Sequence, residues 1–303
     1  MGDGGAGMIF LSNQITAGHV PQNKNAIVTL LIGERYVGTW VTACQSSWAS
    51  YAASHGFDII LVNALPDMSD FGLGRSPAWQ KLLILEQPWS ALYERIVWID
   101  SDIIINRTAP DILESVPDVG RIGVAGGKAQ RESPAYQVLC ERMRGALLRP
   151  EIWPRAALRL DMDQFERALD MKVDEDVIMY NTGVMVVSPA HHRDLFSRTY
   201  RDYSCQTRLY EQPALCYEMH RAGLIHEISG RFNWSVLLMR FLYFPETGFK
   251  DVTPEMYQEM LPMLRKELGI SYFLHFASCM GLLMAVKEGD LEPDAHAQVP
   301  GPG

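Results

Sequence analysis

The sequence predicts an α/β fold, a three-layer α/β/α sandwich around a mostly parallel central sheet. Short apolar runs rich in Val and Ile recur along the chain and are typical of buried strands. Segments with apolar residues at helical spacing separate these runs. This β-α-β-α-β order favours parallel strands joined by helices that cover both faces of the sheet.

The first strand is expected at residues 26–32 and the second at residues 57–62. Between them, apolar residues at helical spacing predict one long amphipathic helix that ends at Gly56. These residues are Tyr36, Trp40, Val41, Cys44, Trp48 and Tyr51.

The second crossover is expected to hold a loop at residues 66–77 and a helix at residues 78–87, which Pro88 stops. The third strand follows at residues 95–99. Pro110 then suits the first turn of a short helix.

After a fourth strand at residues 122–125, the strand pattern is lost from residue 128 to about residue 173. Arginines among helix-forming stretches favour a solvated helical insertion there; a lid or an acceptor-binding segment is the alternative. The strand pattern returns at residues 184–187. Two helices with proline in the first turn and a last strand at residues 272–276 follow.

The composition limits the classes of function. The chain has 303 residues, of which 48% are hydrophobic and 21% charged, as in ordinary globular proteins. The net charge of −9 argues against a broad surface for nucleic acid. Five scattered cysteines indicate a reducing compartment, so we expect a cytoplasmic protein, with peripheral membrane association as the alternative. No apolar run reaches transmembrane length.

The domain organisation follows from these patterns. We expect one domain over residues 23–287, with flexible segments at residues 1–22 and 288–303.

Two aspartates, Asp100 and Asp102, directly follow the strand at residues 95–99 and precede a second apolar run. Unpaired buried carboxylates are costly, so two of them at a strand end need a partner. Hard divalent cations such as Mg²⁺ and Mn²⁺ prefer oxygen ligands. A turn capped by aspartate is the alternative. Ligands bind beyond the carboxyl ends of parallel strands, where these aspartates are expected to lie.

Six segments in a fixed order together carry a family resemblance. They are Ala26-Ile27-Val28-Thr29-Leu30 with Tyr36; Trp79-Gln80-Lys81; Ile99-Asp100-Ser101-Asp102; Tyr180-Asn181-Thr182-Gly183-Val184; Glu211-Gln212; and His275-Phe276-Ala277-Ser278-Cys279. The set resembles retaining glycosyltransferases of the GT-A type, especially the glycogenin-like family 8 and the galactosyl- and xylosyltransferases of family 34. The resemblance implies a GT-A (Rossmann-like) fold and metal-dependent transfer of a hexose or pentose, expected from a UDP-sugar, to a hydroxyl acceptor.

The resemblance also implies roles for single residues. Asp100, Asp102 and His275 would bind Mn²⁺ or Mg²⁺, and carboxylate with imidazole ligation suits Mn²⁺ better than Ca²⁺. Glu211 and Gln212 would lie beside the anomeric carbon, with Glu211 as a covalent nucleophile left open. The donor-binding residues would be Thr29, Leu30, Tyr36, Lys81, Asp100, Ser101, Asn181, Thr182 and Gly183, with Tyr36 stacked on the uracil.

The sequence departs from the family pattern at two points. Glu211 stands where the family usually has Asp, and no Lys follows the His275 motif before Lys287. The candidates for the missing cation are Arg231, Arg240 and Lys250.

Two functions from other classes compete with this interpretation. A sugar-1-phosphate nucleotidyltransferase normally has a glycine-rich basic loop after its first strand, whereas residues 31–36 contain one glycine. A non-catalytic nucleotide-sugar-binding protein would keep the fold without turnover, and the missing Lys is consistent with it. The expected partners are a nucleotide-sugar donor and a hydroxyl-bearing acceptor, with carbohydrate favoured.

Overall fold

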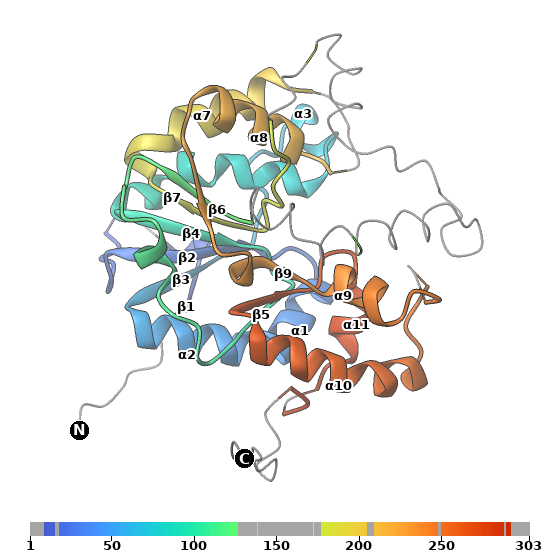
Figure 1. Cartoon of the computed structure of the whole chain (residues 1–303). Coiled ribbons are helices and arrows are strands. Elements are labelled where there is room, and N and C mark those ends of the chain that lie inside the picture. The colour runs from blue at the N-terminus through green and yellow to red at the C-terminus, as the bar shows by residue number, and fades with distance from the viewer. Residues whose placement is uncertain are drawn as a thin grey trace.

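The computed structural model describes residues 9–15, 18–126, 138, 172, 177–204, 209–247, 250–287 and 289–291 (Figure 1). The helical insertion expected at residues 128–173 lies outside the described residues, apart from residues 138 and 172. The expected flexible tail lies outside them apart from residues 289–291.

A seven-stranded sheet forms the centre of the molecule, in the order β1-β3-β2-β4-β7-β6-β8. Neighbouring strands are parallel except at β7, which is antiparallel to both β4 and β6. The mostly parallel sheet is therefore confirmed. Its strands are β1 (Ile9–Leu11), β2 (Asn25–Leu30), β3 (Phe57–Val62), β4 (Arg95–Ile99), β6 (Ile122–Ala125), β7 (Val184–Val187) and β8 (Ile225–Ile228).

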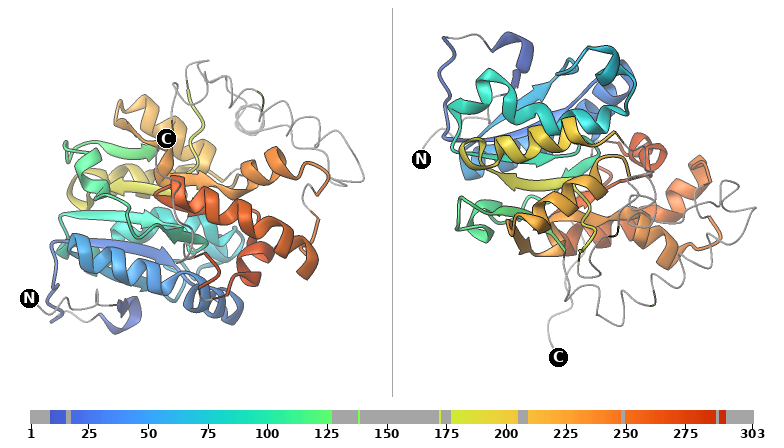
Figure 2. Two further views of the ribbon diagram at one scale, coloured as in Figure 1. Left: turned by 60° about the horizontal axis from the view of Figure 1, so that its bottom comes forward. Right: turned by 90° about the horizontal axis from the view of Figure 1, so that it is seen from above.

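Helices lie on both sides of this sheet and make the predicted three layers (Figures 1 and 2). Successive residues of β2 belong to opposite cores, because Ile27 packs in one hydrophobic cluster and Val28 in the other. The first cluster includes α1 (Glu34–Ala43), α2 (Gln45–His55), α10 (Pro254–Ile270) and α11 (Met280–Ala285). The second includes the 3₁₀ helix η2 (Pro77–Glu86), α7 (Pro189–Asp202) and α8 (Gln212–Arg221).

A second, three-stranded sheet has the order β5-β10-β9 and joins distant parts of the chain. Its strands are β5 (Ile103–Ile105), β9 (Trp234–Ser235) and β10 (Phe273–His275). β10 is antiparallel to β5 and parallel to β9. The remaining elements are η1 (Ser12–Gln14), α3 (Asp70–Leu73), η3 (Pro88–Leu92), η4 (Ile112–Ser115), η5 (Gly230–Asn233) and α9 (Val236–Tyr243).

The prediction of one long helix after the first strand was wrong. The helix is interrupted at Cys44, whose φ of −114° lies outside the range typical of a regular helix. Helical hydrogen bonds continue on both sides, from the Cys44 amide to Trp40 and from the Trp48 amide to Cys44. Trp40, Cys44, Trp48 and Tyr51 are buried as expected. Tyr36 and Val41 instead point away from the core, with 47% and 52% of their surface exposed.

The loop expected at residues 66–77 contains the short helix α3, which begins where the Ser69 hydroxyl accepts a hydrogen bond from the Gly72 amide. The helix expected at residues 78–87 is the 3₁₀ helix η2 and starts one residue earlier, since Ser76 caps it and Pro77 occupies its first turn.

The structure also differs from the prediction at the start of one short helix and at the edge of the sheet. The short helix η4 begins at Ile112 rather than Pro110, because the Asp111 carboxylate caps it by accepting from the Leu113 amide. β1 falls in the segment expected to be flexible and extends the sheet beside β3.

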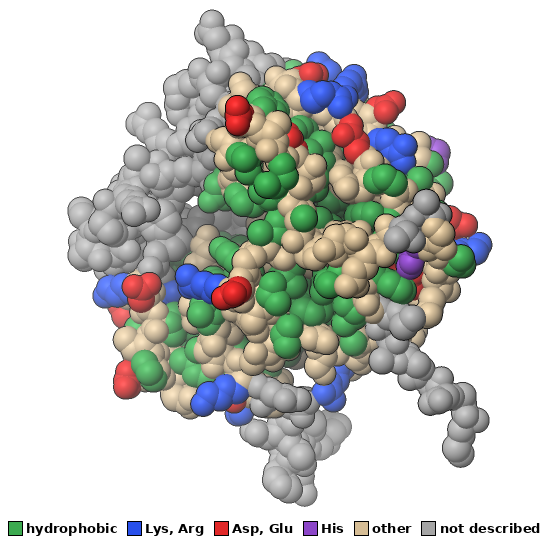
Figure 3. Space-filling view, turned by 180° about the vertical axis from the view of Figure 1, so that it is seen from behind, with side chains coloured by type: hydrophobic (Ala, Val, Ile, Leu, Met, Phe, Trp, Pro, Cys, Tyr) green, Lys and Arg blue, Asp and Glu red, His purple; other side chains and the backbone are tan. Residues whose placement is uncertain are grey.

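None of the described helices has the length and hydropathy needed to cross a bilayer. On the face opposite to that of Figure 1, hydrophobic side chains gather in the middle and charged ones toward the rim (Figure 3).

Candidate metal and donor site

The register of the small sheet brings His275 to the two aspartates. β10 pairs with β5 so that His275 lies opposite Ile103, the residue after Asp102. The Phe276 amide then donates to the Asp102 carbonyl oxygen at 2.9 Å. As a result, His275 Nε2 lies 3.2 Å from Asp102 Oδ1 and 4.0 Å from Asp100 Oδ2. The three residues expected to bind a metal therefore lie together.

This group of ligands fits a divalent cation. One ligand atom from each of Asp100, Asp102 and His275 lies within 4.8 Å of the others. An octahedral ion with bonds of about 2.1 Å places adjacent ligands about 3.0 Å apart and opposite ligands about 4.2 Å apart. The His275–Asp102 and His275–Asp100 distances of 3.2 and 4.0 Å are close to these two values.

Electrostatics couple His275 to Asp102. Burial raises the pKa of the Asp102 carboxyl, but the neighbouring imidazole more than offsets this and holds that pKa below its usual range. Burial lowers the pKa of His275, and the Asp102 carboxylate outweighs burial, so that pKa is raised. A bound cation would replace the imidazole proton as the positive partner of the aspartates.

The buried side chain of Lys81 contacts Asp100. Its Nζ is 3.1 Å from Asp100 Oδ1 and 2.9 Å from Glu211 Oε1. Burial lowers the pKa of Lys81, but the two carboxylates outweigh it, and the pKa is raised, so Lys81 is charged. The Trp98 indole N–H also donates to Asp100 Oδ1, at 2.7 Å. Because Oδ1 of Asp100 accepts hydrogen bonds from both Lys81 and Trp98, Oδ2 is the oxygen that remains available to a cation.

Glu211 and Gln212 hold the turn that precedes β7. Glu211 Oε1 accepts from the Thr182 hydroxyl at 2.8 Å, and Gln212 Oε1 accepts from the Thr182 amide at 3.1 Å. Glu211 Oε2 is buried and has no hydrogen-bond partner within the described residues. Burial raises the pKa of the Glu211 carboxyl, and Lys81 offsets part of the rise. Tyr210, just before the pair, has a φ of 56°, which is uncommon for a residue with a side chain.

The motif Asn181-Thr182-Gly183 packs against the imidazole of His275. A Cβ atom on Gly183 would lie 2.4 Å from His275 Cε1, so the ring can sit there only because residue 183 is glycine. Asn181 Oδ1 accepts from the Gly183 amide at 2.9 Å, which fixes the turn. The structure thus joins the residues expected around the sugar to those expected around the metal.

One residue of this site has no sequence-based signal. Asn233 Oδ1 is 2.7 Å from His275 Nδ1, while Asn233 Nδ2 donates to the carbonyl and side-chain oxygens of Asn181. Asn233 directly precedes β9, and β9 pairs with the strand that carries His275. Only the pairing of these distant strands places Asn233 at the site.

The residues expected around the nucleotide base are less closely grouped. Thr29 is fully buried within β2 and its hydroxyl has no partner among the described residues, so contact with a nucleotide would need a change in conformation. Leu30 ends β2 and is half-buried. Tyr36 lies half-exposed in the first turn of α1. The Ser101 carbonyl accepts a hydrogen bond from the Cys44 thiol at 3.7 Å.

Two of the three candidates for the missing cation are committed elsewhere. Arg240 is buried and donates to Thr247 and to the Lys250 carbonyl. Arg231 donates to the Ile270 carbonyl and to the Tyr272 hydroxyl. Lys250 is exposed.

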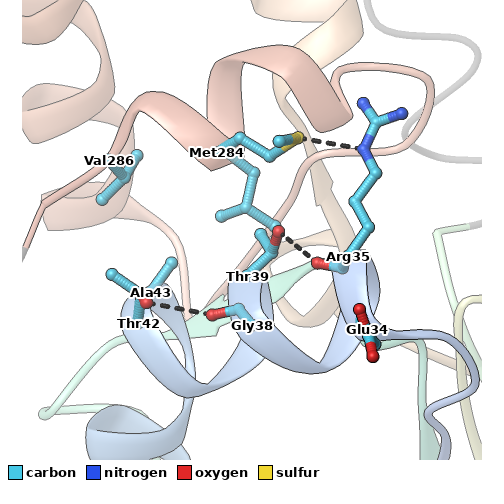
Figure 4. Close-up of a pocket in the computed structure, with 9 residues that line it drawn as sticks. Glu34, Arg35, Gly38, Thr39, Thr42, Ala43, Met284 and Val286 are labelled. Carbon is cyan, nitrogen blue, oxygen red and sulfur yellow. Dashed lines mark hydrogen bonds between the residues drawn. The ribbon is translucent and has the colours of Figure 1, made fainter.

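A pocket of about 330 Å³ lies between α1 and α11 (Figure 4). Arg35 Nε contacts Met284 Sδ there at 3.2 Å, which places a cation beside α11. None of the residues expected to bind metal or sugar lines this pocket. The residues that line it are Glu34, Arg35, Gly38, Thr39, Thr42, Ala43, Leu283, Met284 and Val286.

The described residues thus form an α/β protein with a carboxylate-imidazole site at the carboxyl end of β4. No protein-family model matches the sequence, and no curated protein is similar to it in sequence. Among solved structures, the chain is similar to a glycosyltransferase involved in glycosylation of the major capsid of PBCV-1, at 12% identity, over 86% of this chain and 99% of that one, with a TM-score of 0.48.

Two further solved structures are similar over most of the chain. The bifunctional glycosyltransferase WbbM matches at 11% identity over 90% of this chain and 52% of that one, with a TM-score of 0.49. The galactosyltransferase LgtC, in complex with donor and acceptor sugar analogs, matches at 11% identity over 82% of this chain and 86% of that one, with a TM-score of 0.41. The function proposed below is based on the geometry of the site.

Proposed function

We propose that this chain is a retaining GT-A glycosyltransferase that uses Mn²⁺ or Mg²⁺ and transfers a sugar from a UDP-sugar to a hydroxyl acceptor. One observation carries the proposal. Asp100, Asp102 and His275 converge at the carboxyl end of β4, where Asp100 contacts the buried Lys81–Glu211 pair. A cytoplasmic location stays a prediction from the sparse cysteines.

The metal ligands would serve the departure of the nucleoside diphosphate. A divalent cation acts as a Lewis acid that stabilises negative charge on the leaving phosphate. Asp102 Oδ1, Asp100 Oδ2 and His275 Nε2 are the atoms that would hold it. Lys81 compensates the negative charge of Asp100 and holds its carboxylate in position before the substrate binds.

Glu211 and Gln212 would act at the sugar. Glu211 Oε1 is fixed by Lys81 and Thr182, whereas Oε2 is buried and has no partner among the described residues. Like the Thr29 hydroxyl, Oε2 would reach the donor after a change in conformation. A carboxylate there can accept a hydrogen bond from a sugar hydroxyl and stabilise positive charge at the anomeric carbon. With retention, the acceptor attacks from the face that the diphosphate leaves, so a phosphate oxygen can take the acceptor proton.

A UDP-release assay with a panel of UDP-sugars tests the proposal. Turnover should require Mn²⁺ or Mg²⁺, and Asp102→Asn should lower it by about 100-fold or more, because a Lewis acid contributes several kcal/mol. Asp194→Asn, which changes an exposed carboxylate on α7, should leave it unchanged.

The same assay separates the competing functions. Release of pyrophosphate from UTP and a sugar 1-phosphate would identify a nucleotidyltransferase. Metal-dependent UDP-sugar binding with no UDP release from any donor, with a panel of acceptors present, would identify a binding protein.

A further inference from the structure

We propose that Asn233 is a positioning residue that fixes the imidazole tautomer of His275, with the proton on Nδ1 and the Nε2 lone pair toward Asp102 and the cation. The role in metal binding rests on the function proposed above, but the tautomer is a property of this chain alone.

The hydrogen-bond chain starts at an atom whose role is unambiguous. The Asn181 backbone carbonyl can only accept, and the Asn233 side-chain atom 3.1 Å from it must therefore be the amide nitrogen. The second contact agrees, because Asn181 Oδ1 already accepts from the Gly183 amide and is 3.0 Å from the same Asn233 nitrogen. Flipping the Asn233 amide would place its oxygen against two other oxygens.

The fixed amide then determines the ring proton. With its nitrogen used by Asn181, Asn233 presents Oδ1 to His275 Nδ1 at 2.7 Å. That oxygen only accepts, so the contact is a hydrogen bond only if Nδ1 carries the proton. In the neutral imidazole, Nε2 is then unprotonated, which is the form that ligates a metal.

Asp102 favours the opposite tautomer. Its Oδ1 lies 3.2 Å from His275 Nε2 and would accept a proton from that nitrogen. Asn233 contacts the other ring nitrogen, Nδ1, and favours the tautomer that carries the proton there. The backbone of Gly183 packs against the same ring edge as Asn233, because a Cβ atom there would lie 2.4 Å from Cε1 and 2.9 Å from Nδ1. Partners of this kind typically affect metal affinity by 10–100-fold.

Nitrogen-15 NMR of His275 in the metal-free protein, above the imidazole pKa, tests the tautomer directly. We expect the proton on Nδ1 in the unaltered protein and on Nε2 in Asn233→Ala, where only Asp102 remains as a partner. A proton on Nε2 in the unaltered protein overturns the proposal. This measurement needs no metal, so it tests the tautomer even if the protein binds no metal ion. Absence of metal binding would contradict only the proposed function.

A double-mutant cycle tests the path to the metal. We expect Asn233→Ala to weaken Mn²⁺ binding by about 10–100-fold in calorimetry and to have no further effect in the His275→Ala background. An equal loss in both backgrounds would show that Asn233 acts on the fold and not through His275. Asn63→Ala, which removes an asparagine that binds Ser12, is the matched control and should leave Mn²⁺ affinity unchanged.

Discussion

Lys81 Nζ lies 2.9 Å from Glu211 Oε1, and the two side chains are only 6% and 2% exposed. The pair joins η2 to the amino end of α8, two elements that cover the same face of the sheet. Each charge is compensated by the other and by Asp100 or Thr182. The contact that should stabilise the fold therefore also holds Glu211 and Thr182, two residues expected near the donor, in position.

Lys81→Met should destabilise the protein by about 3–5 kcal/mol, because it leaves Glu211 as a buried, uncompensated charge. The double variant Lys81→Met/Glu211→Gln should lose less than the single one. Urea unfolding of the unaltered protein, the single variants Lys81→Met and Glu211→Gln, and the double variant measures the four free energies. A double variant as unstable as the sum of the single ones would show that the two side chains do not interact.

Glu211→Gln should keep UDP-sugar binding and lower kcat by about 100-fold or more, as removal of one preorganised stabilising group does elsewhere. Steady-state kinetics and calorimetry with the same donor provide the two quantities. Glu218→Gln changes a buried carboxylate of α8, the helix that follows Glu211, and is the control; Glu218 is paired with Tyr203 and Arg221. Near-normal kcat in Glu211→Gln would assign the carboxylate a structural role.

Gly183→Ala should abolish tight Mn²⁺ binding, since the new Cβ would occupy the place of the His275 ring. Gly123→Ala provides a matched clash, because its Cβ would lie 2.5 Å from Val116 Cγ2, within the core. Both variants should lower the midpoint of thermal unfolding, and only the first should change Mn²⁺ affinity. Equal Mn²⁺ affinities in the two variants would contradict the role of the glycine.

Tyr36→Ala should weaken UDP binding by about 1–3 kcal/mol if the ring stacks on uracil. Tyr36 is half-exposed in the first turn of α1, where its ring is free of the core. Val37→Ala changes the exposed neighbour and should have no effect in the same calorimetric titration. An unchanged dissociation constant for Tyr36→Ala would reject the stacking.

His192 should make stability depend on pH. Burial lowers its pKa, and its Nδ1 accepts from the Ser188 amide while Nε2 faces the Gly120 carbonyl, so the folded protein resists a second ring proton. The unfolded chain binds that proton below about pH 6.5. The free energy of unfolding should therefore fall as the pH drops from 6.5 toward the lowered pKa.

Urea unfolding at several pH values measures this slope. His192→Gln should flatten it, whereas His191→Gln, a change at the exposed neighbour, should not. An identical slope in the unaltered protein and in His192→Gln would show that another group is responsible.

Local sequence patterns were sufficient for several strands. β3, β4, β6 and β7 have the predicted bounds, because each is a short, buried and mostly apolar run. The break at Cys44 could not be predicted, since apolar residues at helical spacing continue on both sides and no Gly or Pro marks it. β1 was missed because three residues provide too little pattern.

From the residues alone, only Asp100 and Asp102 indicated a site, whereas His275, Lys81 and Glu211 were predicted through the family resemblance. Asp100 and Asp102 stood out because two carboxylates follow a buried strand. The position of His275 depends on the antiparallel register of β10 and β5, and that of Asn233 on the pairing of β9 with β10. The resemblance implied that Lys81 and Glu211 both lie near the donor, but neither segment predicts the ion pair that they form.

The reversed direction of β7 has a consequence for the evolution of the chain. β6 and β7 are antiparallel neighbours, so residue 126, where the chain leaves β6, and residue 183, where it enters β7, are at the same edge of the sheet. The intervening segment therefore starts and finishes at one edge of the sheet, and it finishes beside Asp100, whose amide donates to the Gly183 carbonyl. Residues can be added or removed there without any chain passing across the sheet. Under the function proposed above, substrate preference could change through this one segment while the strands and the proposed metal ligands stay unchanged.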